Sequence, residues 1–350
     1  MISALSCYLP KERPVLILAP MQDVTDLPFM KIMHHYKGAD LYYTEYFRVH
    51  RDSTLEKHIS RSITENPTGK PVIAQMIGED IPALVRTAKQ LERLPIAGVD
   101  LNLGCPAPVV CKKSAGGGLL RHLEHLNNLL RTLRENISGP FTVKTRVGFE
   151  SQEEFEQLLE IFSRYLIDAL TVHGRTVKEM YRSHVHYDRI AKAVSHMPCP
   201  VFANGNIISP NTAKMVTKMT QARGLMIGRG AIRNPWLFEQ IRETFEMGYV
   251  KTRPMLRDVL EYIRLIYQET HQEGFKETAH VSKMKKYMNF IAQGVNGNDI
   301  FLNEIRRATS EADFFSICTK HLDNDAPFEV EPPTSHLINS GNPRVDCYTK

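Results

Sequence analysis

A cysteine follows the end of an apolar run, in a position where side chains can do chemistry. The run ends at Asn102, and Gly104, Cys105 and Pro106 come next. A glycine and a proline on either side favour a loop over the inside of a strand. A thiol with an ordinary pKa of roughly 8.5 stays mostly protonated at neutral pH, which suits a proton donor. The alternatives are a small buried hydrophobic residue or a disulfide with Cys111. We predict a catalytic acid at Cys105 and a substrate contact at Asn102.

A lysine ends a second apolar run, at Lys144. An ammonium group in such a place is costly to desolvate unless it meets an anion or an electron-rich ring. A reduced flavin would provide both, and the amide of Gln75 could hydrogen-bond to the heteroatoms of the same ring. The alternative is an ion pair between Lys144 and Asp100 or Glu45. The pattern favours a flavin site.

Cationic and aromatic residues follow two further runs. His173 alone is as often a satisfied histidine at a strand end as a ligand, but Arg175 lies two residues on. Together with Arg146 and Tyr181 it offers groups suited to a polyanion or a nucleobase. A metal site built on His173 is discounted, because the neighbouring histidines match no zinc-binding spacing. We therefore expect Arg146, Arg175 and Tyr181 to bind the substrate.

Two glycine-containing turns fit a phosphate site. They are Asn204-Gly205-Asn206 and Gly228-Arg229-Gly230, each after an apolar run. Glycines let backbone N–H groups approach phosphate oxygens, and a nearby arginine adds positive charge. The alternative is a pair of tight turns with a solvated arginine.

The elements that must position these residues alternate along the chain. Eight short apolar or β-branched runs are separated by amphipathic segments such as 81–94, 120–135 and 152–165, which have helical spacing. Eight strand and helix units predict a (β/α)₈ TIM barrel, in which the loops after the strands form the active face. The predicted strands are 15–20, 41–45, 71–75, 99–103, 141–144, 169–173, 201–204 and 224–228.

The chain after residue 250 has a different pattern. Strand-like runs stop, and four helical patterns fill residues 255–322. We predict a barrel domain over 1–246, a smaller all-helical C-terminal domain over 247–324 whose basic clusters fit either a solvated helix face or RNA, and a poorly ordered tail over 325–350.

Composition limits the class of protein. The apolar share is 42%, the formal net charge is +5, and no window approaches the roughly 20 apolar residues that cross a bilayer. The start of the chain lacks the pattern of a signal peptide. The six cysteines are scattered and form no disulfide framework or paired metal motif, so reduced thiols are expected. We expect a cytoplasmic monomer with no membrane contact.

The motifs together resemble the tRNA-dihydrouridine synthases, flavoenzymes that reduce a uridine in tRNA. The resemblance spans roughly residues 14–310. Within the family, the segments 43–49, 116–118 and 280–285 are most similar to the bacterial C-type branch, which acts on the uridine at D-loop position sixteen. Asn206 departs from the acidic residue common there, and the tail has no recognised counterpart. The shared motifs are Leu18-Ala19-Pro20-Met21 with Thr25-Asp26, Gln75, Asn102 to Pro106, Val143 to Arg146, Val172 to Thr176, Asn204 to Asn206 and Ile227 to Gly230.

The resemblance implies a function and a set of residues. The enzyme would reduce the C5=C6 bond of uracil with FMN, Cys105 would protonate C5, and Asn102 would lie at the uracil. NADPH or NADH would reduce the flavin in the same pocket. The alternatives are an FMN barrel acting on a free pyrimidine and an RNA-binding module with a vestigial redox site. The implied FMN contacts are Pro20, Met21, Gln22, Gln75, Lys144, His173, Asn204, Gly205, Asn206, Gly228 and Arg229.

Overall fold

Parallel strands close into a barrel. The computed structural model describes residues 4–295 and 298–332, and the sheet order in this part of the chain is β2-β1-β9-β8-β7-β6-β5-β4, closed by a pairing of β2 with β4. The predicted (β/α)₈ barrel is confirmed, and its eight strands lie where the apolar runs are. The bounds are β1 (Val15–Leu18), β2 (Leu41–Tyr43), β4 (Val72–Ile77), β5 (Gly98–Leu103), β6 (Phe141–Arg146), β7 (Ala169–His173), β8 (Val201–Asn204) and β9 (Gly224–Ile227).

One further strand pairs with the edge of the ring. It is β3 (Phe47–Arg48), which lies beside Met76 and Ile77 of β4. Two residues are too short to show any periodicity in the sequence, so this strand was not predicted.

Helices cover the outside of the barrel, and caps fix where several of them begin. Asp26 accepts a hydrogen bond from the N–H of Phe29, and Asp80 and Ser209 cap two other helices in the same way, each with proline in the first turn. The bounds are α1 (Leu27–His35), α2 (Lys57–Thr64), α3 (Ile81–Leu91), α5 (Leu123–Asn136), α6 (Phe155–Ser163), α7 (Tyr187–His196), α8 (Pro210–Thr220) and α10 (Leu237–Glu246), with short α4 (Pro108–Lys112) and α9 (Arg229–Arg233).

The barrel interior is apolar toward the amino ends of the strands. Val15, Ile17, Phe202 and Met226 are fully buried there in one cluster, separate from the larger core between the strands and the helices. Leu5, from the 3₁₀ turn η1 (Ala4–Tyr8), belongs to the same cluster and closes this end. The packing at this end stabilises the barrel, because it buries large side chains away from water.

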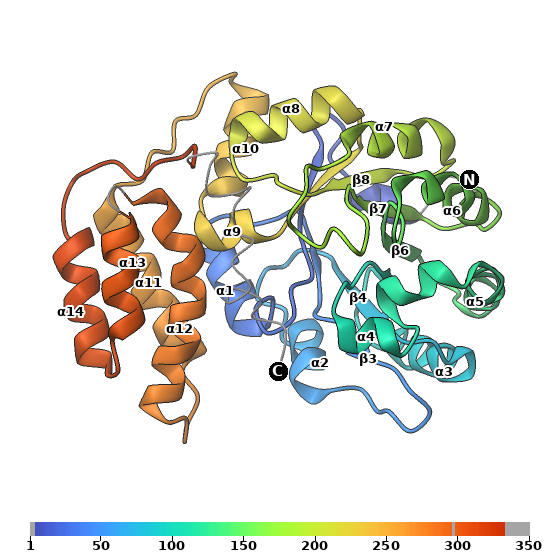
Figure 1. Ribbon diagram of the computed structural model, residues 1–350, viewed down its shortest axis with the longest axis horizontal. Helices are drawn as coiled ribbons and strands as arrows, with labels where there is room; N and C mark the ends of the chain where they lie inside the picture. Colours follow the sequence, from blue (N-terminus) through green and yellow to red (C-terminus); the bar gives the residue numbers. More distant parts are fainter. Residues whose placement is uncertain (1–3, 296–297, 333–350) are drawn as a thin grey trace.

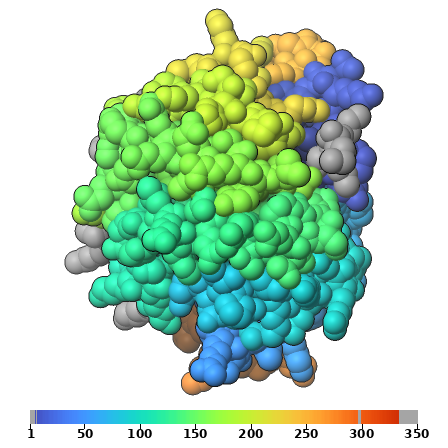
Figure 2. Space-filling model, turned by 90° about the vertical axis from the view of Figure 1, so that its right-hand side faces the viewer, coloured from blue at the N-terminus to red at the C-terminus, as the bar shows by residue number. Residues whose placement is uncertain are grey.

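The helical region lies on one side of the barrel, as Figure 1 shows. It consists of α11 (Leu256–Thr270), α12 (Glu277–Ile291), α13 (Asn298–Arg307) and α14 (Glu311–Leu322). Its buried residues belong to the same continuous core as the outer layer of the barrel. Figure 2 shows the side that is on the right in Figure 1, away from the helical region, where segments from the middle of the chain form most of the surface. None of the helices in the described ranges combines the length and the apolar composition that crossing a membrane requires.

Residues 325–332 return from α14 to the barrel. Phe328 is 3% exposed and packs against Trp236, and the guanidinium group of Arg233 lies 4.9 Å from its ring centre. Met255 and Pro327 form an isolated antiparallel bridge. This stretch is the first part of the predicted tail, 325–350, and an aromatic side chain anchors it to the barrel. The rest of that prediction, 333–350, lies outside the described residues.

Candidate active site

The predicted site residues meet at the carboxyl ends of the strands. In the sheet register Gln75 pairs with Asp100, Asn102 with Lys144, and Arg146 with His173. His173 in turn pairs with Asn204 of β8. Paired residues of neighbouring parallel strands point to the same side, and these point into the barrel. The mouth of the barrel is therefore lined by amides and cations, above the apolar end.

A chain of buried hydrogen bonds leads to the loop of Cys105. Thr142 donates to Asp100 (2.6 Å), Gln75 donates to the other oxygen of Asp100 (2.7 Å), and Asn102 donates to Gln75 Oε1 (2.8 Å). The Oδ1 atom of Asn102 then accepts from the N–H groups of Gly104 (3.0 Å) and Cys105 (2.9 Å). Asn102 thus fixes the cysteine loop, while its amide nitrogen and that of Gln75 each carry a second N–H.

The thiol of Cys105 is free and half-buried. Burial raises its pKa, and this outweighs the opposing effects of the Ala107 backbone, Arg146, Lys144 and the Tyr46 hydroxyl. The thiol is therefore protonated at neutral pH, as an acid must be. Cys111, the alternative disulfide partner, is also free and donates its S–H to the Cys105 carbonyl oxygen (3.5 Å).

Lys144 is disfavoured as a cation. Burial and the charge of Arg146 lower its pKa to about 8, against the opposing effects of Asp100 and Cys105. Asp100, the expected alternative partner, is instead hydrogen-bonded to Gln75 and Thr142, and burial raises its pKa to about 6. Glu45, the other alternative, has a pKa raised to about 7 by burial and by Asp26 and Asp23. An anionic ligand beside Lys144 would stabilise its charged form.

The two arginines predicted to contact the substrate bind loops of the protein. Arg146 is 1% exposed and donates to the carbonyl oxygens of Gly104 (2.8 Å), Thr176 (2.8 Å) and Met180 (2.7 Å). Arg175, also 1% exposed, donates to the Ser183 carbonyl (2.7 Å) and to the Asn206 side chain (3.2 Å). Sequence reasoning found the residues but missed this role, because carbonyl acceptors leave no trace in side-chain composition.

His173 and Tyr181 lie in the same cationic mouth. Burial, and then the charges of Arg146, Lys144 and Arg175, hold the pKa of His173 well below its usual value, so the imidazole is neutral. The Tyr181 ring lies 6.0 Å from that of His173, and the guanidinium groups of Arg146 and Arg229 lie 5.2 and 4.9 Å from its centre. Tyr181 is thus placed among the cations by contacts with both arginines.

The loops after β1, β8 and β9 are adjacent. Asn204 donates to the Met226 carbonyl (2.7 Å), and a Cβ atom on Gly228 would lie 3.3 Å from the sulfur of Met21. Gly205 has φ +124°, a conformation that side chains rarely adopt, and Tyr187 donates to its carbonyl oxygen (2.9 Å). The two predicted phosphate turns therefore lie beside each other and beside the Pro20 loop.

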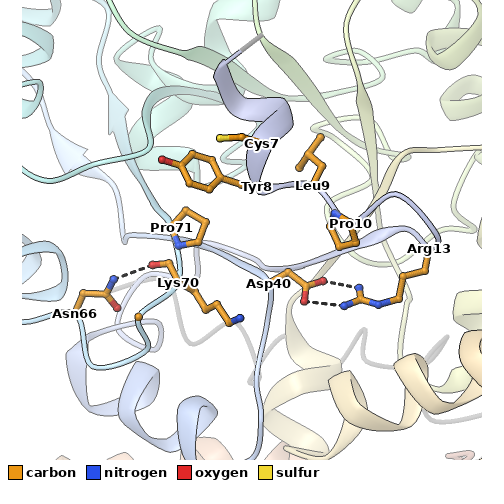
Figure 3. Close-up of a pocket in the computed structure, with 10 residues that line it drawn as sticks. Cys7, Tyr8, Leu9, Pro10, Arg13, Asp40, Asn66, Lys70 and Pro71 are labelled. Atoms are coloured by element: carbon orange, nitrogen blue, oxygen red, sulfur yellow. Dashed lines mark hydrogen bonds and ion pairs between the residues drawn. The ribbon is translucent and has the colours of Figure 1, made fainter. Parts of the chain in front are cut away.

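A cavity lies at the other end of the barrel. Figure 3 shows it, with a volume of about 710 Å³, between the η1 turn and the residues that precede the strands. Arg13 and Asp40 form an ion pair on its wall (2.6 Å), and Asn66 donates to the Lys70 carbonyl. None of the predicted site residues lines it.

Comparison with known proteins shows to which family the chain belongs. The family model described as Dihydrouridine synthase (Dus) matches residues 17–326. The chain belongs to the dihydrouridine synthase family. A probable tRNA-dihydrouridine synthase of Helicobacter pylori is 37% identical over 274 residues, which is 77% of this chain and 83% of that protein. The tRNA-dihydrouridine synthase B of Pasteurella multocida is 30% identical and covers 82% of this chain and 86% of its own length.

Relatives named as (16) synthases and as B synthases test the expected similarity to the bacterial C-type branch. The tRNA-dihydrouridine(16) synthase of Haemophilus ducreyi is 29% identical, over 80% of this chain and 87% of that protein. Synthases named B include one from Pseudomonas syringae, which is 36% identical over 69% of this chain and 71% of that protein. The family is confirmed, and the identities support a relationship to the bacterial B synthases rather than the expected C-type branch. Family membership also separates this chain from enzymes of free pyrimidines.

A solved structure supports the fold alone. The histamine dehydrogenase from Rhizobium sp. 4-9 superimposes with a TM-score of 0.51 at 12% identity, over 75% of this chain and 50% of that chain. At this identity the likeness describes the barrel architecture and says nothing of the site.

The dihydrouridine synthase family is flavin-dependent, and the mouth of this barrel suits such a cofactor. The Oε1 atom of Gln22 is buried without a partner among the described residues, so it can accept a hydrogen bond from a ligand. Lys144 and His173 have pKa values lowered by burial and by neighbouring cations, a strain that an anionic group would relieve.

The sequence analysis did not assign two further residues to the site. Tyr46, just before β3, acts on Cys105 through its hydroxyl, and Arg48 lies over its ring at 5.6 Å. Thr142 anchors the chain of hydrogen bonds from inside β6. An alternation of polar residues in Thr142, Lys144 and Arg146 was the available signal, since every second side chain of a strand faces the barrel interior.

Proposed function

We propose that this protein reduces the C5=C6 bond of a uridine in tRNA to 5,6-dihydrouridine. The observation that carries the proposal is the position of Cys105. A buried chain of hydrogen bonds holds its loop at the barrel mouth, and Lys144 lies one strand away in register with Asn102. Reduction of this bond needs a hydride at C6 and a proton at C5.

Cys105 supplies the proton as general acid. Its raised pKa keeps the sulfur protonated until the substrate arrives, and the cations Arg146 and Lys144 stabilise the thiolate that remains. In the neutral His173, Nε2 accepts from Arg175 (3.4 Å), so the N–H at Nδ1 can be donated to a ligand ring. The free N–H of Asn102 can bind a carbonyl oxygen of uracil.

The proposed cofactor is FMN, reduced by NADPH or NADH. When bound, the reduced flavin provides the hydride. Lys144 and Gln75 would contact its ring, and the turns at 204–206 and 228–229 would hold its phosphate. Pro20, Met21, Gln22 and His173 would complete the pocket. The crowding of cations around His173, which lowers its pKa, supports an anionic cofactor at this place.

The proposed substrate is a uridine in the D-loop of tRNA. The names of the B and (16) synthases among the relatives support tRNA. We propose that the helical region, 247–324, binds the tRNA while the target base leaves its stack and enters the mouth. The enzyme would act as a cytoplasmic monomer.

Substitution of the proposed acid tests the function directly. In Cys105→Ala, dihydrouridine formation on unmodified tRNA should fall roughly 10²- to 10⁴-fold, the contribution of one general acid. Cys199→Ala is the matched control, because Cys199 is a half-buried free thiol at the amino end of β8. Mass spectrometry of the tRNA measures the product, and absorbance of bound flavin checks the cofactor site.

The proposal is wrong if wild-type protein with bound flavin leaves tRNA unmodified. It is also wrong in its assignment of the acid if Cys105→Ala works at the rate of Cys199→Ala.

A further inference from the structure

Arg146 connects two loops that carry different parts of the site. It is the last residue of β6, and its guanidinium group is buried at the mouth. Its Nε atom donates to the Gly104 carbonyl oxygen, next to Cys105 (2.8 Å). Its Nη1 atom donates to the carbonyl oxygens of Thr176 and Met180 (2.8 and 2.7 Å), in the segment that carries Tyr181. One side chain therefore binds backbone on both sides of β6.

The geometry needs an arginine. Its donors are spread over a rigid planar fork, whereas a lysine carries all its donors on one nitrogen. A lysine at this position would leave at least one loop without its donor, and a buried carbonyl oxygen without a partner is costly. The 174–186 segment also has a Met180 backbone with φ +53°, which an unrestrained methionine rarely adopts.

A second arginine binds only one of these loops. Arg175 donates to the Ser183 carbonyl and to the side chain of Asn206 (2.7 and 3.2 Å). The contacts of Arg175 therefore stabilise the 174–186 segment without reaching the backbone of Gly104. Arg175 also donates toward His173 Nε2 (3.4 Å), but none of its contacts reaches the Cys105 loop, which makes Arg175 a control for the coupling.

We propose that Arg146 is a positioning residue that couples the Cys105 loop to the Tyr181 loop, rather than a direct contact to the substrate. The proposal deepens the function proposed above and rests on it for its kinetic consequence. The thiol and the aromatic ring are held in one mutual arrangement because the same guanidinium group binds the backbone next to each. Displacing either loop by about 1 Å would cost roughly 10²-fold in rate.

Hydrogen exchange of the flavin-loaded protein without tRNA tests the coupling. In Arg146→Lys, which keeps the charge, exchange should rise in peptides covering both 104–111 and 176–183. In Arg175→Lys, it should rise only in the second. Unchanged exchange in Arg146→Lys, or the same pattern in both variants, would overturn the proposal.

Kinetics separates positioning from substrate contact. Arg146→Lys should lower kcat roughly 10²-fold and leave KM for tRNA little changed. A raised KM with unchanged kcat would mean that Arg146 binds the substrate directly, and the proposal would fail. If wild type makes no dihydrouridine, the proposed function fails, while the exchange experiment still decides whether the loops are coupled.

A measurement on the wild-type protein guards against a variant that does not fold. In low denaturant, native-state exchange should show 104–111 and 176–183 opening together, with the same free energy. Independent opening of the two segments would contradict the coupling.

Discussion

Charged side chains have opposite environments at the two ends of the barrel. At the amino end Asp40 accepts hydrogen bonds from Arg13 (2.6 and 3.0 Å), and these contacts, with Arg242, hold its pKa below the usual value although burial opposes them. At the carboxyl end Lys144 and His173 have pKa values lowered by burial and by the charge of Arg146. Charge is paired at one end and crowded at the other.

The difference shows which end stabilises the fold. The amino end combines a paired carboxylate with a tightly packed apolar cluster that includes Phe202 and Met226. The mouth, on the same strands, carries groups whose charged forms the fold disfavours. Apolar packing below the mouth offsets that cost, and the mouth keeps groups that are suited to binding an anionic ligand. Substitutions at the two ends should therefore have opposite effects on stability.

The largest effect is expected at the apolar end. Phe202→Ala removes a fully buried ring from the barrel interior and should lower the free energy of unfolding by roughly 3–5 kcal/mol. Denaturant unfolding measures this change. Met219→Ala, at a side chain that is 54% exposed, is the control and should stay within about 0.5 kcal/mol. A small effect of Phe202→Ala would show that this end does not carry the stability of the barrel.

A smaller loss is expected where charge is paired. Asp40→Asn should cost roughly 1.5–3 kcal/mol at neutral pH, because it removes a charged acceptor from Arg13, Arg242 and the Leu16 N–H. Since the folded pKa of Asp40 is below its unfolded value, its contribution is present above roughly pH 4 and is lost as pH falls through the folded pKa. Unfolding of both proteins at pH 7 and pH 3 measures this. A difference that persists undiminished at pH 3 would contradict the pairing.

The same contrast limits what the sequence could predict. The strands, the helical region and the membership of Lys144 and His173 in one site followed from apolar periodicity, because strand ends of a parallel barrel converge. The role of Arg146 did not, since its partners are backbone oxygens of distant loops. Phe328 was placed in a tail of low order because a single aromatic residue gives no periodic signal. Packing against Trp236 then anchors it.

The smallest effect, and the one of opposite sign, is expected at Lys144. Lys144→Met replaces a disfavoured charge with a side chain of similar size and should stabilise the flavin-free protein at pH 7. The folded pKa of about 8 is below the unfolded value of 10.5, so the unfolded state binds more protons and wild-type stability rises with pH between the two. The advantage of the variant should shrink by roughly 2 kcal/mol between pH 7 and pH 9.5.

Unfolding at these two pH values measures the change, and the contributions of buried cysteines and tyrosines cancel because the variant and the wild type share these residues. Flavin titration of the same variant separates stability from binding, because loss of the cation should weaken flavin affinity while the fold gains stability. If the variant is less stable than the wild type at pH 7, the charge of Lys144 is stabilised by a partner, as the charge of Asp40 is. The contrast between the two ends of the barrel would then fail.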